Sequence, residues 1–193
     1  MIWWLRIRAA PAVLGATLLI LLVAVLAPRS EVPVPSVVGG LTSGMPLRDL
    51  VPLLPVLLML YGKGRADEQF EKVAARPVAY FDITFALFVI GVTLLAATVV
   101  PDGLAVARNV AGYLGFALLV QWCSTARFAT ALTAFMPFAV GSIGGHGGNP
   151  AWWAWPMHEG EEPAAAVAAS LLCIGGLTLS TCTPLMGTRE PEE

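Results

Sequence analysis

Residues 62–82, GKGRADEQFEKVAARPVAYFD, decide the fold, because they form a charged interruption between two strongly apolar runs. The charged residues that precede Tyr80 are Lys63, Arg65, Asp67, Glu68, Glu71, Lys72 and Arg76. Charged side chains are expensive to bury in lipid, whereas the runs on either side are apolar enough to lie in it. We therefore interpret this stretch as a surface segment that joins two membrane spans.

The composition of the whole chain is that of an integral membrane protein. Of its 193 residues, 57% are hydrophobic and only 12% are charged, and the mean hydropathy is +0.76. A soluble domain contains about 25% charged residues. The net charge of -2 includes no basic patch of the kind that binds nucleic acid. The three cysteines form no CxxC pair, which favours apolar packing over a metal site or a disulfide framework.

Six segments approach the roughly 20 apolar residues that a helix needs to cross hydrocarbon. The first could end at a signal-cleavage position after Ala27, but Pro28 would be a poor first residue of a mature chain, so we expect a retained span. Pro52 and Pro55 interrupt the second segment, so we expect part of it to kink or to enter from an interfacial turn. The sequence thus predicts an all-α, polytopic membrane protein with six transmembrane helices in one domain, residues 1–193. The approximate spans are 11–27, 46–61, 81–100, 104–122, 128–143 and 164–186.

Lysine and arginine are distributed unevenly over alternate loops, and such an excess marks the cytoplasmic side. With a cytoplasmic amino terminus, the inside set is Arg6, Arg8, Lys63, Arg65, Lys72, Arg76, Arg127 and Arg189. The outside set is then Arg29, Arg48 and Arg108. We therefore expect both termini and residues 62–80 to be cytoplasmic.

The loop between the fifth and sixth spans, GGHGGNPAWWAWPMHEGEEP, contains Trp152, Trp153 and Trp155. Indole rings favour the depth of the lipid headgroups, so this loop fits an interfacial or re-entrant hairpin at the outer leaflet. Two roles remain open for its tryptophans, an ordinary aromatic belt and a lid that contacts substrate.

A few ionisable residues lie close to the expected spans. Arg48 and Asp49 are at the outer end of the second span, Asp82 is just inside the third, and Arg108 is about one turn into the fourth. Because a charge in lipid is costly, each of these residues either anchors its helix at the interface or lines a pathway. A nearby Arg76 is one local partner for Asp82.

Sequence motifs indicate no catalytic site and no cofactor. His146 and His158 are twelve residues apart in one loop, which is not a metal-binding spacing on a helix. Neither GxSxG nor GxxxxGK[ST] occurs, so energy from ATP would have to come from another polypeptide.

Residues 66–75 are predicted to form a short amphipathic helix within the charged interruption. The helix pairs Glu68 with Lys72 and ends before Pro77, and Phe70, Val73 and Ala74 line one face. That face suits either a groove on a partner protein or the inner leaflet of the membrane. The residues alone leave both possibilities open.

Together these features resemble the permease subunits of ABC-2-type transporters. That family has six spans, cytoplasmic ends, an amphipathic amino-terminal elbow helix, a coupling helix between spans two and three, and a re-entrant outer hairpin between spans five and six. Its loop motif Leu-Glu-x-Leu-Leu-x-x-Pro-Val corresponds here to Phe70, Glu71, Val73, Ala74, Pro77 and Val78. Residues 1–10, MIWWLRIRAA, correspond to the elbow helix.

The resemblance implies a non-catalytic, multi-pass permease subunit of an ABC exporter in a cell membrane, here a bacterial plasma membrane. Its implied partners are a separate ATP-binding-cassette ATPase, a second permease subunit and membrane lipids. The coupling helix would dock the ATPase, and the substrate pathway or subunit interface would use Arg48, Asp49, Arg108 and the three tryptophans of the outer loop. One alternative is a small intramembrane enzyme that acts on a lipid-linked substrate, and another is a membrane scaffold that transports nothing.

Overall fold

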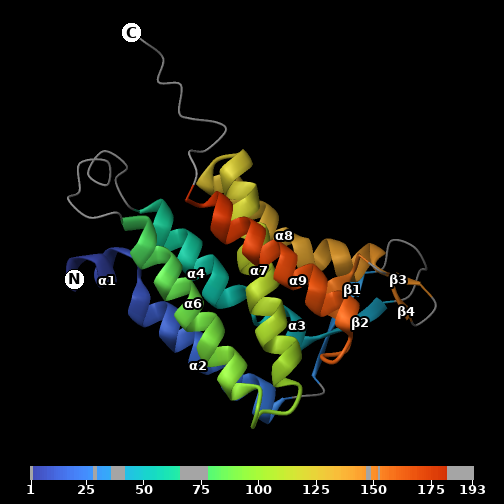
Figure 1. Cartoon of the computed structure of the whole chain (residues 1–193). Coiled ribbons are helices and arrows are strands. Elements are labelled where there is room, and N and C mark those ends of the chain that lie inside the picture. Colours follow the sequence, from blue (N-terminus) through green and yellow to red (C-terminus); the bar gives the residue numbers. More distant parts are fainter. Residues whose placement is uncertain are drawn as a thin grey trace.

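The computed structural model describes residues 2–27, 30–35, 42–65, 78–146, 149–151 and 153–181, and most of these residues are helical (Figure 1). The helices are α1 Ile2–Ile7, α2 Ala10–Leu26, α3 Leu47–Leu50, α4 Leu53–Gly64, α6 Val78–Ala96, α7 Gly103–Cys123, α8 Ala126–Ile143 and α9 Pro163–Leu179. The strands are β1 Glu31–Pro35, β2 Thr42–Pro46, β3 Gly145–His146 and β4 Asn149–Pro150, and a 3-10 helix, η1, covers Trp155–Met157. The predicted coupling helix, with Phe70, Glu71, Val73, Ala74 and Pro77, lies outside the described residues.

The six longer helices, α2, α4, α6, α7, α8 and α9, alternate in direction between two ends of a bundle (Figure 1). At one end Arg8, before α2, contacts both Lys63 of α4 and Asp82 of α6, and we call this the Arg8 end. At the opposite end Arg48 pairs with Asp102, which precedes α7, and we call this the Arg108 end. Consecutive long helices are therefore antiparallel, whereas α7 packs parallel to both α4 and α9.

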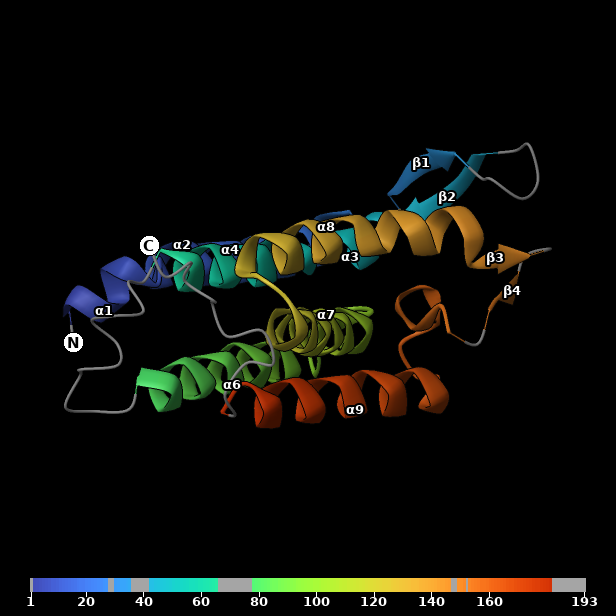
Figure 2. The ribbon, with the colours of Figure 1, turned by 90° about the horizontal axis from the view of Figure 1, so that it is seen from above.

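Helix α7 lies between two layers of helices, with α2, α4 and α8 on one side and α6 and α9 on the other (Figure 2). The residues of α7 are mostly buried, and Val106, Val110 and Tyr113 are among the least exposed residues of the core. The surrounding helices instead present large apolar side chains outward, such as Leu18 of α2 and Phe135 of α8. Soluble monomers rarely expose contiguous apolar surface on this scale.

Within the described residues, α6, α7 and α8 are long and apolar enough to cross a membrane. Together with the apolar exterior, they indicate a membrane protein. The bounds of α7 and α8 agree within two residues with the predicted spans at 104–122 and 128–143, whereas α6 begins three residues before the predicted span at 81–100 and ends four residues before its end. Helices α2 and α9 are also apolar but have 17 residues each, and residues 182–186 of the predicted sixth span lie outside the described part of the chain.

The predicted second span, 46–61, is interrupted where its prolines predict, but its helical part continues to Gly64 rather than ending at residue 61. The structure divides it into the single turn of α3, a break at Val51 and Pro52, and α4, which continues to Gly64. Prolines at positions 52 and 55 lack the backbone N–H that a continuous helix would use there. The break places Arg48 and Asp49 on a separate short turn that packs against α7.

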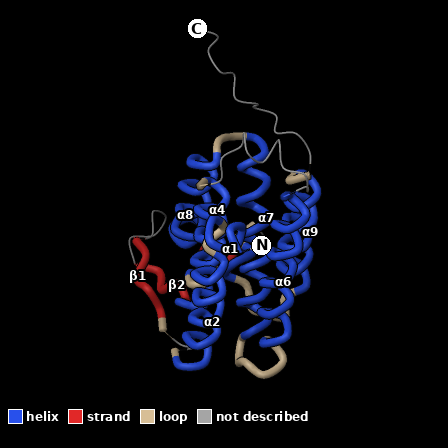
Figure 3. Tube along the Cα trace, turned by 90° about the vertical axis from the view of Figure 1, so that its left-hand side faces the viewer, coloured by secondary structure: helices blue, strands red, loops and turns tan. Residues whose placement is uncertain are grey.

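The purely helical prediction also omits two short hairpins. Strands β1 and β2 pair antiparallel, with Pro33 opposite Gly44, beside α8 (Figure 3). A two-stranded hairpin has only edge strands, so a proline costs no ladder hydrogen bond if its nitrogen faces outward. The second hairpin, β3–β4, has two residues in each strand.

The closest helix packing is between α7 and α9, where small residues meet. A side chain on Gly115 would overlap the backbone of Leu172 and Cys173, and one on Gly176 would overlap the backbone of Gly115. The Ala- and Gly-rich composition of α9 permits this close approach. Cys173 is buried here as predicted, whereas Cys123 is exposed, so the packing interpretation is wrong for that residue.

Candidate functional site

A cluster of buried polar side chains lies at the Arg108 end, between α3 and α7. Asn109 and Tyr113 are four residues apart on α7 and therefore share one helix face, and both face α3. Asp49 on α3 has an exposed fraction of 0%. Buried polar groups require hydrogen-bond partners, so this cluster has a specific structural or functional role.

Three contacts attach Asp49 to its surroundings. Asn109 Nδ2 donates to Asp49 Oδ1 at 3.1 Å, and the Tyr113 hydroxyl donates to the backbone oxygen of Asp49 at 2.8 Å. Arg48 Nε lies 3.8 Å from the same carboxylate oxygen, while the other end of the Arg48 guanidinium pairs with Asp102. Asp49 Oδ2 has no hydrogen-bond partner among the described residues. The cluster therefore ties α3 to α7 and to the turn between α6 and α7.

Arg108 fixes the segment between α8 and α9 to the end of the bundle. Its Nη1 donates to the backbone oxygen of Glu159 at 2.6 Å, and its Nη2 donates to that of His158 at 2.7 Å and that of Pro156 at 3.4 Å. Asn109 Nδ2 also donates to the Pro156 oxygen, at 3.1 Å. We call these contacts the Arg108 latch. Arginine suits this position because its planar guanidinium can direct several N–H donors at neighbouring acceptors.

The latched segment carries Trp155 into the bundle. The indole is 5% exposed, and its ring centre lies 5.2 Å from that of Tyr113. The glycine at position 112 leaves room for the indole, because a Cβ there would overlap the indole ring. The aromatic-belt interpretation is therefore wrong for Trp155, which packs inside the protein. Trp153 is exposed, and Trp152 lies outside the described residues.

The structure brings together only some of the residues that the sequence suggested for a pathway or interface. Arg48, Asp49, Arg108 and Trp155 lie in one region, and the buried Arg108 guanidinium is directed at backbone oxygens of the outer segment. The His158 ring lies 3.1 Å from the backbone oxygen of Ala151. Among the described residues, no group of three His, Cys, Asp or Glu side chains could hold a metal ion.

Sequence reasoning missed Asn109, Tyr113 and Gly112. The four-residue spacing of the first two, on an otherwise apolar helix, is a local signal that could have indicated a polar helix face. Nothing local to Gly112 indicates that a tryptophan 43 positions later packs on it. That contact depends on how the outer segment folds back.

A second polar group of residues lies at the Arg8 end. Arg8 is 5% exposed, and its guanidinium forms an ion pair with Asp82 at 2.7 Å and a hydrogen bond to the other carboxylate oxygen at 2.8 Å. Trp4 Nε1 donates to Asp82 Oδ1 at 3.2 Å, and Arg8 donates to the backbone oxygen of Lys63 at 3.3 Å. Asp82 is thus satisfied by a distant arginine, whereas the local partner suggested by the sequence, Arg76, lies outside the described residues.

These contacts hold the short helix α1 against the start of α6. Ala9, between α1 and α2, has a φ of 50°, in the left-handed region, so the chain turns sharply there. Gly62 passes so close to the Arg8 backbone that any side chain would overlap it. The sharp turn and the Arg8–Asp82 pair together fix the angle between α1 and the bundle.

We expect Asp82→Asn to lower the free energy of unfolding by about 3 kcal/mol, because it leaves the Arg8 guanidinium largely buried without its counter-charge. Arg8→Gln should cost a similar amount, and the double variant should cost much less than the sum of the two. Unfolding of the purified protein by denaturant in detergent micelles would give these values. Arg65→Gln, at an exposed arginine of the same end, is the control and should change little. Additive costs for Arg8 and Asp82 would contradict the coupling.

The fold and the two polar groups define a helical membrane protein with a buried central helix and a latched outer segment. No family model, curated protein or solved structure matches the chain.

Proposed function

We propose that this chain is the transmembrane permease subunit of an ATP-binding-cassette exporter of the ABC-2 type. One observation carries the proposal, the order of the parts along the chain. A short helix joins the first long helix through a sharp turn, six long helices alternate in direction, and a non-helical segment between the last two folds back into the bundle. The ABC-2-type resemblance implies the same order of elbow helix, six spans and re-entrant outer hairpin.

In this proposal all six long helices cross a cell membrane. The Arg8 end is cytoplasmic, with both termini and residues 66–77, and the Arg108 end faces outward. The 17-residue helices α2 and α9 are about 26 Å long, slightly short of the roughly 30 Å hydrocarbon core. Local thinning of the bilayer accommodates a mismatch of this size at modest cost. Helix α4 is shorter, with 12 residues, and the turn of α3 that precedes it covers part of the remaining distance to the outer surface.

The proposed substrate pathway lies between two permease subunits. Within one subunit α7 lies between the two helix layers, and Trp155 with the Arg108 latch closes the outer end beside it. A pathway therefore requires a second subunit. The nucleotide-driven movement comes from a separate ATPase, which docks on residues 66–77.

The alternative of an intramembrane enzyme receives less support from the geometry. Arg48, Asp49 and Arg108 are close together, but backbone oxygens already occupy donors of the Arg108 guanidinium, and Tyr113 and Asn109 cover Asp49. A substrate would have to displace the latch before it could reach these groups. A non-transporting scaffold would differ from a permease in showing no substrate-dependent ATPase response.

We expect Phe70→Asp/Val73→Asp to reduce the stimulated ATP hydrolysis of the complex more than about tenfold, because it places two charges on the apolar stripe that fits a partner groove. The measurement is co-purification of the ATPase, followed by its activity in proteoliposomes. The matched control is Lys72→Gln/Ala75→Asp, which changes the net charge equally on the opposite side of the predicted helix. Intact coupling in the first variant, or equal loss in both, would exclude this docking surface.

A further inference from the structure

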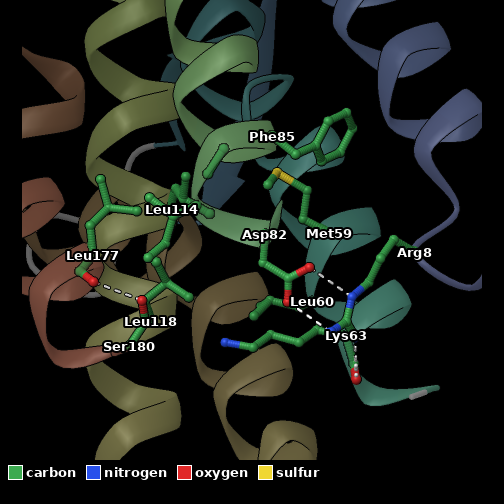
Figure 4. A pocket seen from close by; sticks show the side chains of 12 residues that line it. Arg8, Met59, Leu60, Lys63, Asp82, Phe85, Leu114, Leu118, Leu177 and Ser180 are labelled. Atoms are coloured by element: carbon green, nitrogen blue, oxygen red, sulfur yellow. Dashed lines mark hydrogen bonds and ion pairs between the residues drawn. The ribbon is translucent and has the colours of Figure 1, made fainter. Parts of the chain in front are cut away.

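Helix α6 is joined by an ion pair at each end to the side of the bundle that contains α2 and α4. At the Arg8 end, Asp82 near the start of α6 pairs with Arg8, which precedes α2 (Figure 4). At the Arg108 end, Asp102 in the turn after α6 pairs with Arg48 of α3 at 2.5 Å. The two pairs therefore connect opposite ends of one helix to the other helix layer.

The pair at the Arg8 end is the more enclosed of the two. The Arg8 and Asp82 side chains are 5% and 20% exposed. Those of Arg48 and Asp102 are 20% and 44% exposed. Trp4 Nε1 also donates to Asp82, at 3.2 Å. Because solvent-exposed ion pairs contribute little to stability, the C-terminal end of α6 is held less firmly than its N-terminal end.

The packing of α6 also weakens toward its C-terminal end. The structure describes every residue of this helix, and no residue of it after Thr93 is buried. Leu95, two residues later, is 73% exposed. A cavity of about 40 Å³ lies beside the N-terminal half, lined by Phe85 and Ala86 of α6 and by Leu114 of α7. Atoms that line a void lack contacts on one side, so the cavity lowers the resistance to a tilt of α6 there.

Arg48 has a second acidic neighbour within reach. Its Nε lies 3.8 Å from Asp49 Oδ1, which is longer than a hydrogen bond of about 2.9 Å. Arg48 Nε and Asp49 Oδ2 are both buried, and neither has a hydrogen-bond partner among the described residues. The Asp49 side chain is 1% exposed, so water does not solvate it as it solvates Asp102. Transfer of Arg48 to Asp49 would therefore satisfy two buried atoms and leave one carboxylate to the solvent.

We propose that Arg48 alternates between Asp102 and Asp49 and thereby controls the C-terminal end of α6. When Arg48 binds Asp102, that end is held against α3. When Arg48 binds Asp49, the end is released, and α6 tilts about the Arg8–Asp82 pair, so that the bundle opens between α2 and α6 at the Arg108 end. The exposed ion pair lost on release is offset by the buried groups that gain partners, which keeps the two states close in free energy. The inference does not depend on an ATPase partner.

The test measures distances between spin labels by pulsed electron paramagnetic resonance, on the full-length protein in nanodiscs with its native cysteines replaced by alanine. One label pair is Leu26→Cys and Val99→Cys, two exposed positions at the Arg108 end. This pair should give a short and a long distance. The second pair, Ala12→Cys and Tyr80→Cys, lies at the Arg8 end and should give one distance. Two distances in the second pair would show that α6 moves as a whole and would overturn the pivot.

Two isosteric variants should shift the first label pair in opposite directions. Asp102→Asn should raise the ratio of long to short distances about fivefold, as expected for the loss of one partly exposed ion pair. Asparagine tolerates the left-handed backbone of this position, where φ is 55°, so the turn itself is kept. Asp49→Asn should lower the ratio about fivefold, because Arg48 then keeps Asp102 as its only charged partner among these residues. Glu31→Gln, an exposed carboxylate at the same end, is the control and should leave the ratio unchanged.

Hydrogen exchange of residues 94–100 provides a second measurement on the protein with its native cysteines. Exchange should become faster in Asp102→Asn and slower in Asp49→Asn. If Asp49→Asn changes neither the distances nor the exchange, Arg48 binds Asp102 alone, and the alternation is overturned. A shift in the same direction in both Asp variants would overturn it as well, since competition between the two carboxylates requires opposite signs.

Discussion

Replacement of Arg108 by methionine should release the outer segment from the bundle and lower the free energy of unfolding by about 3–5 kcal/mol. The change removes the donor from the backbone oxygens of His158 and Glu159, while methionine keeps a similar apolar volume. The Pro156 oxygen loses the longer of its two hydrogen bonds and keeps the one from Asn109. A buried acceptor left without a donor costs about 1–3 kcal/mol, so the total is large for one side chain. Arg108 itself is only 6% exposed, so water replaces the lost donor only after the segment moves.

Hydrogen exchange of residues 153–162, together with denaturant unfolding in detergent, would measure this effect. Exchange should become faster in that segment, and the Arg8 end should keep the exchange of the parent protein. Arg127→Met is the matched control, since Arg127 is exposed at the start of α8. Arg108→Lys should recover only part of the stability, because an ammonium lacks the planar fork of a guanidinium. Unchanged exchange in Arg108→Met would mean that Trp155 packing alone holds the segment.

The positions of the long helices could be predicted from the sequence because apolar length is a local property. The charged interruption at 62–82 separates α4 from α6, and Pro101, Asp102 and Gly103 mark the turn before α7. The interruption of the second span was predicted as a kink or an interfacial turn, but the positions at which α3 ends and α4 begins were not. Proline indicates where a helix loses a hydrogen bond, but the separate turn of α3 depends on its packing against α7.

The polar contacts could not be predicted, since their partners are far apart along the chain. Arg8 and Asp82 are 74 residues apart, and Asp49 and Asn109 are 60 apart. The cost of placing a charge in a membrane indicates that Asp49, Asp82 and Arg108 need partners, but it does not identify those partners. The burial of Trp155 could not be predicted for the same reason. The preference of tryptophan for a membrane interface is a property of the residue, whereas the burial of this indole depends on the space left by Gly112, 43 residues earlier.

The crossing of α7 and α9 depends on a glycine in each helix, Gly115 and Gly176. Around the crossing, the buried face of α9 carries Ala165, Ala169, Cys173 and Gly176. Apolar side chains gain little by leaving lipid for another helix, so close van der Waals contact is the main force that holds two such helices together. Helix α9 also contacts η1, so its position helps to set that of the latched segment.

We therefore expect Gly176→Ala to destabilise the protein by about 2–3 kcal/mol, because the new methyl group would overlap the backbone oxygen of Gly115 and force the helices apart. Gly175→Ala is a control on the adjacent residue, since its Cβ would meet only Leu119, at 3.9 Å. Alanine has a higher helix propensity than glycine, so this control should be neutral or slightly stabilising. Denaturant unfolding of both variants gives the comparison.

Gly115→Ala should have a cost similar to that of Gly176→Ala, and the pair tests whether one contact is responsible. If both residues act at the same crossing, the first substitution already separates the helices, and the second adds little. The double variant should then lose clearly less stability than the sum of the two single losses. Separation of α9 should also loosen η1, so hydrogen exchange at 155–157 should rise in each single variant and not in Gly175→Ala. Additive costs, or exchange that stays slow, would show that the helices accommodate each methyl group independently.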